Sequence, residues 1–129
     1  MASRLFQQFQ GSLEKGVVKL YATVVSSTSG TIASQSAKGL VVAKTAAKTG
    51  RYTITLADRY ISLLNVTVTL QGAADAAYTT ARGIEPFIRT VSMTDRQIIV
   101  QFVSTAGADA EIEDAARFYV EITLKNSSV

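Results

Sequence analysis

Three residue types are missing from this sequence of 129 residues: cysteine, histidine and tryptophan. The absence of cysteine excludes disulfides, thiolate metal ligands and a cysteine nucleophile. The absence of histidine excludes imidazole metal ligands and a Ser-His-Asp triad, and it removes the usual proton-transfer group at neutral pH. We therefore expect a protein that is not an enzyme and that carries neither a cofactor nor a metal.

Other chemical sites are also poorly supported. The sequence contains no Walker A sequence and no dinucleotide fingerprint, so no phosphate-cradling loop is expected. No pair among the ten Asp and Glu residues is marked out for glycoside hydrolysis. The densest acidic group comprises Asp109, Glu111, Glu113 and Asp114. Its alternation is similar to a calcium loop, but position twelve counted from Asp109 is Val120 instead of a bidentate Glu, so we expect a solvated loop.

Long hydrophobic runs and basic clusters are absent as well. No stretch approaches the ~18 apolar residues of a membrane-spanning helix, and the first nine residues lack a signal-peptide core. Residues 1–60 carry eight basic and two acidic groups, whereas residues 61–129 carry five basic and eight acidic groups. This asymmetry suits an acidic partner, head-to-tail contacts between copies, or contacts within one domain. With no basic run, we expect neither a nucleic-acid partner nor a membrane partner.

From residue 17 onward the sequence alternates as β-strands do. The period of two is clearest over 17–25, 50–56, 65–70, 97–103 and 118–125, with shorter candidates at 40–43 and 87–93. The stretch 97–103 is apolar on nearly both faces, which indicates a central strand, and 58–64 is expected to form one helical turn. We predict an all-β fold, an antiparallel β-sandwich or barrel of about six to eight strands, as a single domain over residues 17–129.

Residues 1–16 differ from the rest and form a predicted N-terminal arm. Leu5, Phe6, Phe9 and Leu13 recur at spacings of three and four, which would line one helical face. Glycines at 11 and 16 interrupt such a helix. The arm is therefore either short-helical and packed on its own domain, or extended toward a neighbouring subunit, where it would span roughly 50 Å.

The five tyrosines are candidates for stacking on sugar rings in a lectin-like site. Tyrosine at strand positions more often packs at the rim of a sandwich core with its hydroxyl at the surface. We therefore expect the second arrangement.

Three stretches carry a resemblance to a known family. They are residues 6–21, residues 50–60 followed by Leu63 and Leu64, and residues 120–128. Together they resemble small virion structural proteins of tailed bacteriophages. Such proteins begin with a Phe/Gln-rich arm and a Leu-Glu-Lys-x-Val-Val segment, continue with a Gly-(Lys/Arg)-Tyr-Thr-x-x-Leu strand, and have an acidic loop before the last strand. The likeness covers most of the chain and is loosest over 72–95.

The resemblance implies a capsid decoration (cement) protein that binds the outer capsid surface and stabilises the shell. Its location would be the virion, assembled in the host cytoplasm. Its implied partners are the major capsid protein and further copies of itself, with a trimer favoured among homo-oligomers. We expect apolar anchors and cations of the arm region to bind the partner, namely Arg4, Leu5, Phe6, Phe9, Leu13, Lys15 and Lys19. The alternative is a tail or fibre-associated virion protein with a host-surface or carbohydrate-binding role.

Overall fold

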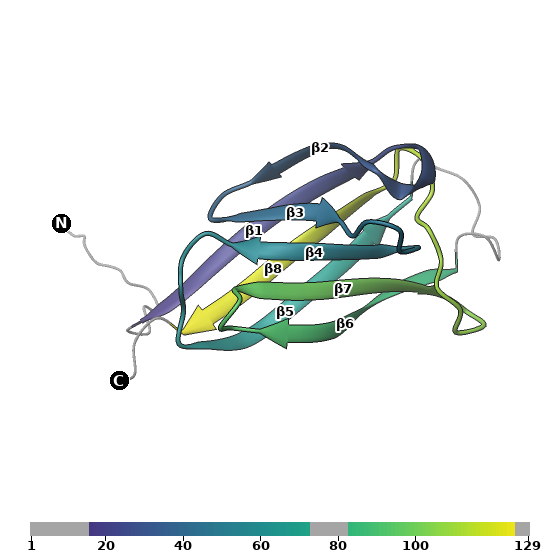
Figure 1. The fold of residues 1–129 in the computed structure, drawn as a ribbon. Coiled ribbons are helices and arrows are strands. Elements are labelled where there is room, and N and C mark those ends of the chain that lie inside the picture. Colours follow the sequence, from purple (N-terminus) through teal and green to yellow (C-terminus); the bar gives the residue numbers. More distant parts are fainter. Residues whose placement is uncertain (1–15, 73–82, 126–129) are drawn as a thin grey trace.

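The computed structural model describes residues 16–72 and 83–125. These residues form eight strands and one short 3-10 turn: β1 (Val17–Ser26), η1 (Thr28–Gly30), β2 (Ile32–Ala37), β3 (Leu40–Lys44), β4 (Arg51–Leu56), β5 (Ser62–Gln71), β6 (Ile84–Ser92), β7 (Gln97–Ser104) and β8 (Arg117–Lys125). They assemble into two antiparallel four-stranded sheets, ordered β2-β1-β8-β5 and β3-β4-β7-β6, which pack face to face (Figure 1). The predicted all-β antiparallel sandwich is confirmed, and the predicted arm up to residue 15 lies outside the described residues.

The core is built from alternate residues of the inner strands. In β4, Tyr52, Ile54 and Leu56 are buried while the residues between them are partly exposed, as the period of two predicts. At the centre, the Tyr52 ring lies 5.7 Å from Phe102 and 5.0 Å from Phe118, measured between centroids. Phe102 and Phe118 belong to β7 and β8, the interior strands of the two sheets. The aromatic cluster therefore joins both layers, and the central position predicted for 97–103 is confirmed.

Two sequence-based expectations need correction, and one strand was not anticipated. β2 was not anticipated, because five of its six residues are exposed and its composition is mostly small and polar. The helical turn expected over 58–64 is wrong, since β5 already begins at Ser62 and the Ile61 amide donates to the Lys125 carbonyl at 2.8 Å. Tyr52 does not lie at the rim: it is fully buried because the Gly30 carbonyl accepts its hydroxyl hydrogen bond inside the protein.

The two sides of the sandwich differ. On one side, β2 and β3 lie next to each other, and on the other side β5 lies next to β6 (Figure 1). The Gln35 side chain of β2 donates to the Val42 carbonyl at 2.8 Å and accepts from the Val42 amide at 3.0 Å. Gln35 thereby satisfies both backbone groups of Val42 on the outer edge of β3, as a neighbouring strand would. The β2/β3 side is therefore closed by a side chain.

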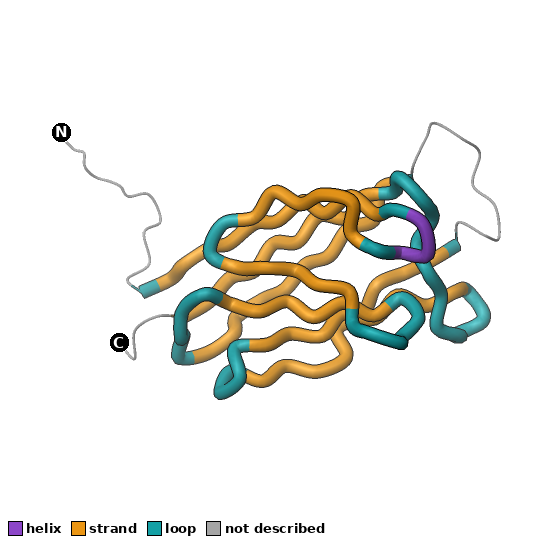
Figure 2. Tube along the Cα trace, turned by 45° about the horizontal axis from the view of Figure 1, so that its top comes forward, coloured by secondary structure: helices purple, strands orange, loops and turns teal. Residues whose placement is uncertain are grey.

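The loops gather at the two ends of the strands (Figure 2). At one end, Val17 and Ser62 both pair with Lys125. The starts of β1 and β5 therefore lie on either side of the end of β8. At the other end lie η1, the 45–50 turn and the 105–116 loop (Figure 1). Within the described ranges, no helix is long and apolar enough to cross a membrane.

Candidate functional site

The predicted partner-binding residues fall into two groups. Arg4, Leu5, Phe6, Phe9, Leu13 and Lys15 lie outside the described residues, so their role remains a prediction. Lys19 is exposed on β1 and pairs in register with Thr123 of β8. It lies near the end of the sandwich at which the described chain begins.

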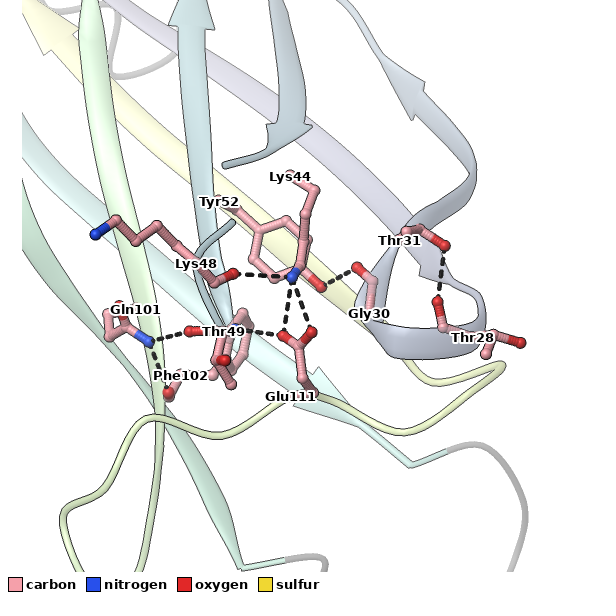
Figure 3. Close-up of polar contacts among 11 residues, drawn as sticks. Thr28, Gly30, Thr31, Lys44, Lys48, Thr49, Tyr52, Gln101, Phe102 and Glu111 are labelled. Carbon is pink, nitrogen blue, oxygen red and sulfur yellow. Dashed lines mark hydrogen bonds and ion pairs between the residues drawn. The ribbon is translucent and has the colours of Figure 1, made fainter. Parts of the chain in front are cut away.

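The most connected polar cluster lies at the opposite end and is formed by Gly30, Lys44, Gly50, Tyr52 and Glu111; we call it the loop clasp (Figure 3). The Glu111 carboxylate accepts hydrogen bonds from the Gly50 amide and from Lys44 Nζ, the latter at 2.8 and 3.0 Å. Lys44 Nζ also donates to the Lys48 carbonyl at 3.0 Å. The clasp therefore ties the 45–50 turn to the 105–116 loop.

Tyr52 extends the loop clasp to η1. Its hydroxyl donates to the Gly30 carbonyl (Figure 3). Burial raises the pKa of Tyr52 above its usual range, and the negative charge of Glu111 raises that pKa further. Tyr52 therefore stays protonated and remains a hydrogen-bond donor at neutral pH.

A second buried polar group supports the same turn. Gln101 is fully buried, and its amide nitrogen donates to the Thr49 carbonyl at 2.8 Å and to the Phe102 carbonyl at 3.0 Å. Its oxygen accepts from Arg51 Nε at 2.9 Å. Because each polar atom of the amide has a partner, Gln101 fixes the turn without leaving an unsatisfied group.

A shallow pocket of about 410 Å³ opens at the loop clasp, lined by Ser29, Thr31, Glu111 and residues 44–49. Its only charged pair in the described structure is Lys44 with Glu111, whose side chains are 19% and 30% exposed. Each charge is neutralised by the other, and the pair also bonds to backbone. The arrangement suits loop fixation, because both groups bond to backbone atoms of the 45–50 turn as well as to each other.

The acidic segment is dispersed by the fold. Glu111 points into the loop clasp, and Asp109 pairs through its backbone with Val103. The Glu113 carbonyl accepts from Ser26 Oγ at 2.5 Å, and Asp114 is exposed. Across residues 16–72 and 83–125, no group of three or more Asp or Glu side chains converges to hold a metal ion.

Four large apolar side chains on or next to β5 and β6 are exposed. Ile61, Leu64, Phe87 and Val91 are 53%, 50%, 43% and 42% exposed; we call these four residues the apolar side. Of these four residues, Phe87 also lines a cleft of about 260 Å³ between β5 and β6, together with Val66, Thr67, Val68, Pro86 and Ile88. Sequence reasoning missed this surface, because β5 has a register shift between Leu63 and Asn65 that leaves Leu64 exposed.

The tyrosines are divided between core and surface. Tyr52 is buried and Tyr60 is half-buried against the core, whereas Tyr78 lies outside the described residues. Tyr21 and Tyr119 are 57% and 39% exposed on the neighbouring strands β1 and β8. These two rings are the only described tyrosines with more than a third of their surface open.

Comparisons with protein-family models, curated proteins and solved structures found no match to this chain. Two surfaces of the described residues remain as binding candidates: the apolar side, and the face that carries Tyr21 and Tyr119.

Proposed function

We propose that this chain is a structural virion protein of a tailed bacteriophage, and specifically a decoration protein that binds the outside of the capsid. The observation that supports a binding role is the apolar side: Ile61 just before β5, Leu64 in β5, and Phe87 and Val91 in β6 remain exposed. The resemblance of residues 6–21, 50–60 and 120–128 to tailed-phage virion proteins supports the identity of the partner.

The apolar side has the properties of a protein interface. Exposed large apolar side chains on neighbouring strands favour binding to another protein. The edge strands β5 and β6 also offer backbone groups on their outer edges, to which a strand of a neighbour can add. Pro86 lies in β6, where an edge strand tolerates its missing N–H.

Part of the apolar side lies at the end of the sandwich where β1 begins, so the capsid could contact it and the N-terminal residues together. Ile61 bonds to Lys125, and Lys125 pairs with Val17 at the start of β1. Residues 1–16 would therefore continue the same contact, with Leu5, Phe6, Phe9 and Leu13 as anchors. Arg4, Lys15 and Lys19 would face acidic capsid surface.

In this proposal, affinity comes from burial across the seams between capsid subunits. A contact of ~800 Å² per copy lies in the range of specific interfaces, and only the surplus over ordering costs becomes affinity. A homotrimer would strengthen binding, because each bound copy raises the effective concentration of the other two. The partner is the major capsid protein.

The test uses purified undecorated capsids mixed with four forms of the protein: the full chain, the chain without residues 1–16, the double variant Leu64→Ser/Phe87→Ser, and Val41→Ser. Val41 is the matched control, because it is 60% exposed but lies on β3, away from the apolar side. Co-sedimentation and the capsid melting temperature are measured. We expect the full chain and the control to bind and to raise the melting temperature, and the other two forms to lose both effects.

Failure of the full chain to bind capsids would overturn the placement on the capsid. Equal binding by the double variant and the control would instead remove the apolar side from the interface. Sedimentation equilibrium of the full chain gives the oligomeric state, and a monomer at all concentrations would contradict the trimer.

A further inference from the structure

The outward face of the β2-β1-β8-β5 sheet carries an ordered array of polar and aromatic side chains. The strand register aligns Tyr21 with Glu121, and Glu121 with Thr67 of β5. In the next row, Thr23 aligns with Tyr119, and Tyr119 with Thr69. Tyr21 and Tyr119 are therefore diagonal neighbours on adjacent strands, and residues in that relation lie roughly 7–8 Å apart. We call this surface the tyrosine face, made of Tyr21, Thr23, Thr67, Thr69, Tyr119 and Glu121.

The tyrosine face is preorganised. The Tyr119 hydroxyl donates to Gln71 Oε1 on the neighbouring strand β5, one row away from Tyr119's own register partner Thr69. This bond holds the ring across the sheet, so a ligand that stacks on it does not have to order it first. Tyr119 is 39% exposed despite this bond, which leaves part of the ring accessible.

Two shallow pockets adjoin each other on the tyrosine face. A shallow pocket of about 230 Å³ lies between the six residues of the tyrosine face. A second hollow of about 320 Å³ shares Tyr21 and Thr23 and continues over Ser36 to Lys38. Together they cross all four strands of the sheet, which suits a chain-like ligand more than a single small molecule.

The charge on this face is predominantly positive. Lys19, Arg117 and Lys125 alternate in phase with Tyr21 and Tyr119 along their strands, so they share the same face. Glu121 is the one acidic residue in phase with them on the four strands of this sheet. A ligand with negative charges at its periphery is therefore favoured.

We infer that the tyrosine face binds an acidic polysaccharide built of pyranose sugars. The CH groups of a pyranose ring stack on the electron-rich faces of Tyr21 and Tyr119. Glu121 accepts hydrogen bonds from sugar hydroxyls, and the threonine hydroxyls donate or accept as required. The sugar carboxylates lie toward Lys19, Arg117 and Lys125. This binding activity goes beyond the proposed capsid role and uses a surface that shares only Lys19 with it.

A single-stranded nucleic acid also combines rings with negative charge, but Glu121 disfavours it as the ligand of the tyrosine face. Glu121 lies opposite Tyr21 on the neighbouring strand and two residues from Tyr119 along β8, so its carboxylate would repel a phosphate backbone that passes over both rings. A sugar hydroxyl at the same place donates to that carboxylate. The observations therefore favour the glycan.

The experiment measures binding of the full chain to three probes by affinity electrophoresis: alginate as the acidic polysaccharide, dextran as the neutral one, and a twenty-nucleotide oligo-dT. We expect retention by alginate that weakens with salt, and weaker or no retention by the other two. Tyr21→Ala and Tyr119→Ala should each weaken alginate binding about tenfold. Tyr119→Phe keeps the stacking ring but loses the bond to Gln71, so it should bind alginate more weakly than the unmodified chain and more tightly than Tyr119→Ala.

Two controls separate binding from folding and from the capsid proposal. Val41→Ala lies on the other sheet and should bind alginate as the unmodified chain does. Leu64→Ser/Phe87→Ser should lose capsid binding but keep alginate binding, so the two proposals fail independently. Circular dichroism of each variant checks the fold. The glycan site is refuted by no retention in alginate, by equal retention in dextran, by stronger oligo-dT binding, or by tyrosine variants that bind unchanged.

Discussion

Replacing Gly50 with alanine should destabilise the protein far more than replacing Gly107. Gly50 has φ +63° and Gly107 has φ +84°, so both positions penalise an L side chain. A Cβ at Gly50 would overlap the Ala110 carbonyl oxygen, and would lie 2.9 Å from the Ala110 carbonyl carbon and 3.1 Å from the Phe102 oxygen. A Cβ at Gly107 would meet nothing within 4 Å. The two substitutions share the backbone penalty and differ in the close approach.

The expected loss in free energy of unfolding follows from the backbone strain and from the hydrogen bonds that Gly50→Ala breaks. The left-handed backbone costs an alanine about 1–2 kcal/mol at either position. At Gly50 the 105–116 loop must also move away, which breaks the bond from the Gly50 amide to Glu111 and the 3.0 Å bond from the Ala110 amide to the Phe102 carbonyl. Each lost bond costs about 1 kcal/mol. We therefore expect about 3–4 kcal/mol for Gly50→Ala and about 1–2 kcal/mol for Gly107→Ala.

Urea unfolding followed by far-UV circular dichroism measures both free energies of unfolding at 25 °C. A loss of about 3 kcal/mol is a large part of the ~5–15 kcal/mol typical of a domain, so the midpoint of Gly50→Ala should fall clearly below that of Gly107→Ala. If the two variants unfold within about 0.5 kcal/mol of each other, the close approach of the 105–116 loop to Gly50 does not stabilise the fold, and the reasoning is refuted.

Three further predictions concern the core and the edge. Because the pKa of Tyr52 is raised in the folded state, Tyr52 stays protonated at a pH at which it ionises in the unfolded chain, so the free energy of unfolding should be constant below pH ~10 and fall above it. Tyr52→Phe should flatten that fall in urea unfolding measured at pH 8–11. The same variant should cost about 1–3 kcal/mol at neutral pH, because the Gly30 carbonyl loses its donor. Gln35→Ala should destabilise by about 1 kcal/mol and speed hydrogen exchange of the Val42 amide, and unchanged exchange would contradict edge closure. Phe118→Ala should cost about 3–5 kcal/mol in thermal or urea unfolding, and a loss below about 1.5 kcal/mol would mean that the aromatic cluster repacks.

The candidate site could be predicted from the sequence only in part. The apolar pattern of residues 1–16 is visible without a structure, and its partner-binding role stays a prediction. The apolar side was not predictable, because the exposure of Leu64 depends on a register shift within β5 and on β5 lying at a sheet edge. The tyrosine face was equally hidden: Tyr21 and Tyr119 are almost a hundred residues apart, and only the pairing of β1 with β8 makes them neighbours.

What the sequence by itself determined is most of the strands and, within the strands it predicted, which alternate side chains share a face. Alternation is a local property, so Tyr52, Ile54 and Leu56 could be assigned to one face from seven consecutive residues. The tertiary structure decided which strands are neighbours, which edges are closed and which side chains meet. Glu111 reaches Gly50 across 61 residues of sequence, and nothing local to either residue specifies that contact. Such contacts form because the two sheets must bury their inner faces together, and that packing selects one arrangement from many with the same alternation.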